Sequence, residues 1–154
     1  MALDVVELLR GGRWGALATV DGGRPHASVV AYAASQDLSH LVLHVSRLAA
    51  HSRHLLVDPR LSLVVSESDS GDGDPQTLAR VTMDGHAQII SRDSADYPAA
   101  RDLYILRLPR SRRLFAFEDF MLFRLVPGRV RYVGGFGAAK TYTPDELKAE
   151  AGTT

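Results

Sequence analysis

The feature that most limits the fold of this chain is a succession of short strand-like segments in which strands and helices do not alternate regularly. Segments of strand type cover 13–20, 25–34, 41–45, 60–66, 77–90, 118–126 and 130–133. Segments with helical spacing cover 1–12, 47–57, 92–108 and 143–151. A parallel doubly wound sheet needs a crossover helix between successive strands, so the pattern disfavours that fold. We expect a mainly β, α+β protein: a small antiparallel barrel with short peripheral helices.

Turn residues predict how some of these strands connect. Asp21-Gly22-Gly23 predicts a hairpin between the first two strands, and Pro127-Gly128 predicts a second two-residue turn near the end. Asp84-Gly85 fits either a tight turn or a glycine bulge in one long strand, and the sequence leaves both open. The apolar end of segment 25–34 predicts a strand that is buried on both faces.

Length and composition exclude several classes of protein. The 154 residues are most simply one domain, 1–154, with a sizeable core. The 18 Lys and Arg balance 18 Asp and Glu, which argues against a nucleic-acid partner. The absence of cysteine removes disulfides and thiolate chemistry. Asp4 and Glu7 interrupt the first apolar segment, and no apolar run approaches a membrane span, so we expect a cytoplasmic protein without a membrane partner.

The stretch 41–59, LVLHVSRLAAHSRHLLVDP, contains the strongest candidate binding site. An apolar strand leads into a helix predicted over 47–57, which Asp58-Pro59 ends. Hydroxyls and cations gather near the helix start: Ser46, Arg47, His51, Ser52 and Arg53. Unpaired backbone N–H groups and the helix dipole favour an anion there, so we infer a phosphate site. An ordinary polar corner with a helix cap is the alternative explanation.

Other patterns carry weaker signals. His40 and His44, and then His51 and His54, have the spacing of metal-binding pairs, but no carboxylate at matching spacing joins them. We therefore expect no metal site. Gly134–Gly137 is either a flexible strand end or a place where backbone approaches a flat ring. No nucleophile and base stand together, so the catalytic residues are unknown and any chemistry is expected to belong to a cofactor.

Four segments follow one another in the order and spacing of a known family. They are GALATVDGGRPHASVVAYA (15–33), HVSRLAAHSRHLLVDPRLSLVV (44–65), ARVTMDGHAQII (79–90) and FEDFMLFRLVPGRVRYVGGFGAA (117–139). Together they resemble the FMN-binding split-barrel superfamily, which is related to pyridoxamine 5'-phosphate oxidase. Within that superfamily the chain is most similar to the haem-utilisation branch.

The resemblance implies a homodimer of six-stranded split barrels with FMN in a groove between the subunits. It assigns the phosphate of FMN to Ser46, Arg47, His51, Ser52 and Arg53. The flavin ring is assigned to His26, Ala27, Ser28 and Val29. The partner chain's Gly134–Gly137, which includes Gly135 and Phe136, is expected to close the site. The implied function is a flavin-dependent oxidoreductase that acts on an unknown small molecule. The alternative is a non-catalytic flavin or haem binding or storage protein; a deazaflavin is a further cofactor that related barrels accept.

Three departures from the family pattern affect the expected chemistry. His51 stands where the oxidases tend to have a lysine, and Ala138 stands where haem-utilisation relatives often have an arginine. The longer haem-degrading relatives use a histidine near their C-terminus as a haem ligand, whereas the last histidine here is His86. These departures lower the expectation of haem degradation, and the residues that bind pyridoxal phosphate in the oxidases have no convincing match.

Overall fold

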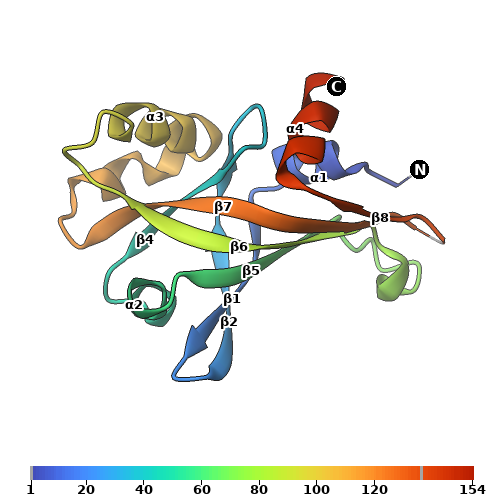
Figure 1. Ribbon diagram of the computed structural model, residues 1–154, viewed down its shortest axis with the longest axis horizontal. Helices are drawn as coiled ribbons and strands as arrows, with labels where there is room; N and C mark the ends of the chain where they lie inside the picture. Colours follow the sequence, from blue (N-terminus) through green and yellow to red (C-terminus); the bar gives the residue numbers. More distant parts are fainter. Residues whose placement is uncertain (1, 136) are drawn as a thin grey trace.

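The computed structural model describes residues 2–135 and 137–154, and its eight strands form one curled antiparallel sheet (Figure 1). The strand order is β2-β1-β5-β6-β7-β4-β3, and β8 pairs with β7. The strands are β1 (Trp14–Asp21), β2 (Arg24–Ala31), β3 (Ala33–Ala34), β4 (Leu41–Ser46), β5 (Arg60–Ser66), β6 (Arg80–Ile90), β7 (Phe120–Val133) and β8 (Ala139–Tyr142). Only β3 and β8 have fewer than six residues, so the long strands of the described chain match the expected α+β split barrel.

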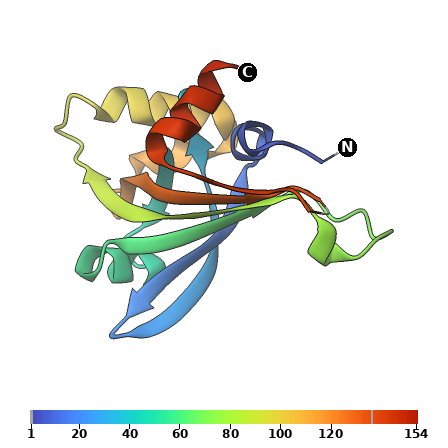
Figure 2. The same ribbon diagram turned by 45° about the vertical axis from the view of Figure 1, so that its right-hand side comes forward.

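Helices cover both sides of this sheet. They are α1 (Val5–Gly11), α2 (Ala50–Val57), α3 (Tyr97–Arg107) and α4 (Pro144–Gly152), with 3-10 turns η1 (Pro75–Thr77) and η2 (Pro109–Ala116). Two views show α3 beside α1 and α4 on one side, and α2 on the other side against the β1–β2 hairpin (Figures 1 and 2). No helix in the described part of the chain is long and apolar enough to cross a membrane.

Local sequence explains where the first and last helices begin. Asp4 and Glu7 form a capping box, in which each backbone N–H donates to the other residue's carboxylate at 2.8 Å. Thr143 caps α4 by accepting from the N–H of Glu146 at 3.2 Å. Both helices then bury an apolar stripe against the main core, whose fully buried side chains include Leu9, Met83, Phe123 and Leu147.

The prediction that segment 25–34 is buried on both faces was wrong. The segment divides into β2 and the short β3, and the side chains of β2 alternate. Val30 is buried, whereas the side chain of Val29 is 69% exposed. The physical reason is coverage of one face only: α2 packs against β2 on one side, whereas Ala27 and Val29 on the other side are exposed in the described chain.

A bulge decides two of the turn predictions. β6 runs through Asp84-Gly85 as a single strand, so the long-strand alternative is confirmed and the tight turn is wrong. Asp84 pairs with Arg129 and Gly85 with Pro127, so the extra residue of the bulge is Gly128 on β7 and not Gly85. The turn predicted at Pro127-Gly128 was wrong, because β7 continues through both residues. On one side of β7, the β4 pairing ends at Leu125 and the β8 pairing begins at Val130. Pro127, which lacks an N–H, therefore falls in the gap between them.

α2 and α3 begin later than predicted. Residues 91–96 form successive turns, in which the N–H of Ser94 donates to Ser91 O at 2.9 Å and that of Tyr97 to Ser94 O at 3.2 Å, so α3 starts at Tyr97. α2 starts at Ala50, because residues 46–49 make a separate turn closed by Ala49 N and Ser46 O at 3.1 Å. This second shift changes which of the predicted site residues lie on the helix.

Candidate functional site

The start of α2 holds polar groups that the described protein leaves unpaired. Its N-cap, Ala49, offers no side-chain oxygen to the first N–H groups, and its first turn has no acidic residue. Ser52 is completely buried, and its Oγ has no hydrogen-bond partner among the described residues. Buried polar atoms are nearly always paired, so this unpaired hydroxyl near a helix start is a candidate contact for a ligand.

His51 precedes Ser52 in α2 and has a second unpaired atom. Its Nδ1 is 3.2 Å from Ser28 Oγ on β2, while its Nε2 is buried without a partner in residues 2–135 and 137–154. Burial, followed by the nearby imidazoles of His26 and His54, lowers the pKa of His51 below its ordinary value. The ring is therefore held neutral until an anion or added acid favours its protonation.

His54 completes a cluster that sequence reasoning did not assign. Its Nδ1 is 2.9 Å from Oγ1 of the buried Thr19, and its Nε2 is 3.6 Å from Asp21 Oδ2. Its ring meets that of His26 edge-on, with centroids 4.9 Å apart. The helical spacing of His51 and His54 is the signal that the sequence offers for this pair, and the metal site that such spacing could indicate is not expected from the sequence. The part of the chain described here contains no group of three side chains arranged to hold a metal ion.

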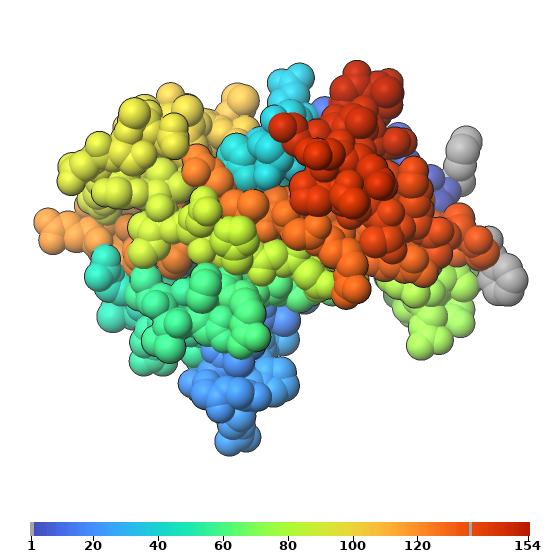
Figure 3. All heavy atoms as spheres, viewed as in Figure 1, coloured from blue at the N-terminus to red at the C-terminus, as the bar shows by residue number. Residues whose placement is uncertain are grey.

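Strand register places the β2 residues on two faces. His26 lies opposite Thr19 and Ser28 opposite Leu17, so both point to the side that α2 covers. Ala27 and Val29 point to the exposed side. Arg53, also exposed, lines a cavity of about 310 Å³ with Asp21 and His54 at the hairpin end (the hairpin projects from the body in Figure 3).

Ser46 and Arg47 do not join this group. Ser46 Oγ donates to Asp119 Oδ2 at 2.8 Å and accepts from the N–H of Leu48 at 3.2 Å. The N–H of Arg47 donates to the carbonyl of Asp119 at 2.6 Å, and the Arg47 side chain lines a different cavity beside Arg92. The residues predicted to hold one phosphate therefore divide into two sets, of which His51, Ser52 and Arg53 are at the start of α2.

Gly135 lies in the connection from β7 to β8, and β8 is at the opposite end of the sheet from α2 (Figure 1). It follows β7 with φ of 64°, and a Cβ built on it would meet only Ala2 Cβ, at 4.0 Å. The N–H of Gly134 donates to the carbonyl of Ala138 at 2.7 Å, which closes a turn. Within one chain Gly135 and α2 are apart, so closure of the site by a partner chain stays a prediction. Phe136 lies outside the described residues.

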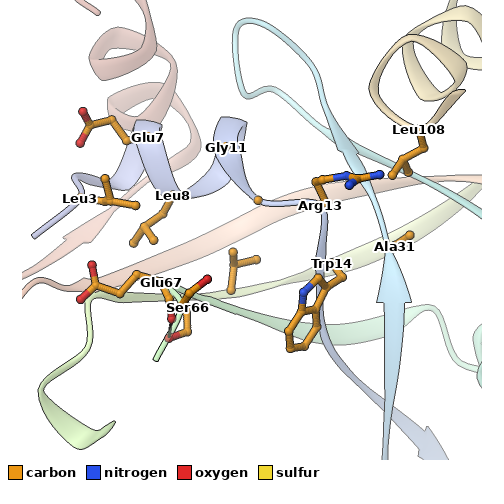
Figure 4. Close-up of a pocket in the computed structure, with 13 residues that line it drawn as sticks. Leu3, Glu7, Leu8, Gly11, Arg13, Trp14, Ala31, Ser66, Glu67 and Leu108 are labelled. Atoms are coloured by element: carbon orange, nitrogen blue, oxygen red, sulfur yellow. Dashed lines mark hydrogen bonds between the residues drawn. The ribbon is translucent and has the colours of Figure 1, made fainter. Parts of the chain in front are cut away.

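A larger cavity of about 570 Å³ lies between α1 and the beginning of β1 (Figure 4). Trp14 and Leu8 form apolar walls, and Glu7 and Glu67 lie at one end. Both carboxylates already accept backbone N–H groups, from Asp4 and Ala79 at 2.8 and 2.9 Å. No residue of the α2 cluster lines this cavity.

Comparison with known proteins identifies the family. The family model for pyridoxamine 5'-phosphate oxidase matches residues 3–134. Heme oxygenase HutZ of Vibrio cholerae is 32% identical over 140 residues, which are 85% of this chain and 74% of HutZ. A chloroplastic heme oxygenase of Arabidopsis thaliana, HOZ, is 33% identical over 139 residues, which cover 88% of this chain and 41% of that protein.

Solved structures agree with these relatives. A heme binding protein from Mycobacterium smegmatis superposes with a TM-score of 0.83 at 30% identity, over 97% of this chain and 62% of its own. HutZ itself, described in its structure as a heme storage protein, gives a TM-score of 0.67 at 29% identity, over 89% of this chain and 98% of its own. The chain thus spans less than two thirds of the mycobacterial and plant proteins. It belongs to the pyridoxamine 5'-phosphate oxidase family of split barrels and, within that family, to the haem-utilisation branch.

Proposed function

We propose that this protein binds haem at the β2–α2 site and serves as a haem binding or storage protein. The observation that carries the proposal is the buried, unpaired His51 Nε2, whose ring lies near the imidazoles of His26 and His54, together with the buried, unpaired Ser52 Oγ in the same turn of α2. The relatives support it, because those named above carry names that refer to heme.

The chemistry of haem suits this set of residues. Its two propionates are carboxylates, which the start of α2, Ser52 and Arg53 would bind as anions. His26 is half-buried on β2, and its imidazole is our candidate for the axial ligand of the iron. Bound haem would supply the redox chemistry of its iron, while these side chains bind and orient it.

A haem titration tests the proposal. We expect a saturable shift of the Soret band in the intact protein and a strong loss of that shift in His26→Ala. His86→Ala is the matched control, because His86 is an exposed histidine on β6 and should leave the titration unchanged. A wild-type protein that gives no Soret shift in excess haem would contradict haem binding. Reductant-driven bleaching of the bound Soret band would instead show an enzyme that degrades haem.

The second candidate is an FMN-dependent oxidoreductase. It is favoured by the same unpaired atoms at the start of α2, which suit a phosphate, and by the family's description as an oxidase. Quenching of FMN fluorescence on titration and turnover of NAD(P)H by the loaded protein are the expected results. Failure of FMN to bind removes this candidate, and tight FMN binding without turnover would leave a flavin carrier.

We also propose that two copies associate through one apolar face of the β1–β2–β5 edge. Register places these small or apolar residues on the same side: Trp14, Ala16, Ala18, Ala27, Val29 and Val64. Trp14, Val29 and Val64 are 62%, 69% and 38% exposed, and an apolar face beside an edge strand favours association. Sedimentation velocity should show a dimer that Val29→Glu dissociates, whereas Leu106→Glu on α3 should remain dimeric. A monomeric wild-type protein would contradict this.

A further inference from the structure

We propose that a second cavity, where the end of β6 and the beginning of β7 meet the start of α3, binds a small organic carboxylate with an apolar body. This site is separate from the β2–α2 site and goes beyond the function proposed above. The cavity measures about 380 Å³, which is within the range of small-molecule sites, about 300 to 1,000 Å³. Its lining combines two arginines with an apolar floor.

The two arginines reach the cavity from different connections. Arg47 follows β4 and Arg92 follows β6, and the two come together because β4 and β6 both pair with β7. The Arg47 guanidinium makes no hydrogen bond or ion pair with any described residue. Arg92 donates through Nη2 to the carbonyls of Phe117 and Phe120, at 2.7 and 3.4 Å, which leaves its other N–H groups available. Guanidinium groups of this kind recognise a carboxylate through paired hydrogen bonds.

The apolar residues and the two arginines fix the class of ligand. Ile90 lies opposite Leu122 across β6 and β7, and both are buried, whereas Ile89, on the other face of β6, is 54% exposed. α3 begins at the rim with Tyr97, and its N-cap is Asp96, whose carboxylate lies 3.4 Å from Arg124 Nη2. The positive charge of the cavity therefore comes from Arg47 and Arg92, and guanidinium groups beside apolar side chains suit an aryl or branched-chain carboxylate.

Glu118 is the one carboxylate among the described residues that line the cavity. It forms no ion pair within 4 Å with either Arg47 or Arg92, so it does not neutralise them through a direct contact. Its charge opposes that of the ligand. Removal of this charge should therefore strengthen binding of the ligand, whereas removal of an arginine charge should weaken it.

The experiment uses 4-fluorobenzoate as the probe, followed by ¹⁹F NMR line broadening with the full chain. We expect the probe to bind, and the neutral 4-fluorobenzamide not to bind. Arg47→Gln should weaken binding of the probe by roughly ten- to a hundred-fold, the effect of one lost charge-assisted hydrogen bond. Glu118→Gln should tighten it, and Arg110→Gln, an exposed control on η2, should leave it unchanged.

Other outcomes would overturn the proposal. Equal broadening of the amide would show that the charge is not recognised, and unchanged affinity in Arg47→Gln would place the probe elsewhere. Displacement of the probe by FMN or haem, with loss of binding in Arg53→Ala, would assign it to the β2–α2 site. Because the probe needs neither cofactor, failure of the haem or FMN titration leaves this test intact.

Discussion

His44 and His51 belong to the same stretch of chain and both bury ring nitrogens that have no partner among the described residues, yet their surroundings differ. His44 on β4 stacks on Phe115, with ring centroids 3.7 Å apart and planes 3° apart, and it meets Tyr104 edge-on at 5.7 Å. His51 on α2 lies against the Ser28 hydroxyl and close to other imidazoles.

This difference separates two meanings of an unpaired buried nitrogen. Around His44 the neighbours are the rings of Phe115, Phe120 and Tyr104, and both of its ring nitrogens are unpaired among the described residues, so the imidazole acts as a packing group. Protonation of this ring is strongly disfavoured, because a buried cation without a partner is costly. Around His51 the neighbours are polar, and Ser52 in the same helical turn carries a further unpaired oxygen. The polarity of the surroundings, and not the number of unpaired atoms, therefore distinguishes the candidate ligand site from the packing histidine.

The largest expected effect follows from His44. Burial, with Arg92 as the second cause, lowers the pKa of His44 from 6.5 to about 4. The unfolded chain therefore binds this proton first, so stability is lost as the pH falls from 6.5 towards 4, by roughly 3 kcal/mol in all. His44→Phe keeps the stacking and removes the proton. Urea unfolding at pH 7 and pH 5 should show a wild-type loss about 2 kcal/mol greater than that of the variant. Equal losses would show that His44 is not buried as a neutral ring.

The next effect compares two arginines of the stretch. Arg53→Ala should weaken binding of FMN by about 1.5–3 kcal/mol, because a charge-assisted hydrogen bond to the phosphate is lost. Arg47→Ala should leave FMN affinity unchanged, because that side chain lines the other cavity. Fluorescence titrations of both variants measure this directly. Equal weakening by the two substitutions would show that the phosphate reaches the Arg47 side of the stretch.

The sequence predicted the fold better than it predicted the site. Turn chemistry at Gly22 and Gly23, both with positive φ, and the break at Asp58-Pro59 act locally, so they could be read from neighbouring residues. The pairing of Ser46 with Asp119 depends on the β4–β7 register, which brings together residues far apart in the chain. The bond between Thr19 and His54 likewise needs the packing of α2 on β1. Spacing alone carries no information about either contact.

Two serines sharpen the contrast between satisfied and unsatisfied hydroxyls. Ser46→Ala should lower the free energy of unfolding by about 1 kcal/mol, because Asp119 and Leu48 lose their partner. Ser52→Ala should not lower it, because the hydroxyl it removes has no partner in the described chain. The order should reverse for cofactor affinity: Ser52→Ala should bind the cofactor more weakly than Ser46→Ala does. A Ser52→Ala protein that is destabilised as much as Ser46→Ala would mean that the Ser52 hydroxyl is satisfied within the protein.

The smallest effect concerns how His51 responds to a bound anion. Its pKa is lowered in the free protein, and a phosphate beside it would raise that pKa, so binding takes up a proton. FMN affinity should therefore rise as the pH falls from 8 to 7, a window that lies above the pKa of the phosphate itself, near 6. His51→Lys carries a permanent charge and should bind FMN without this slope, while riboflavin, which has no phosphate, should show none with either protein. A slope that persists in His51→Lys would show that His51 does not take up the proton.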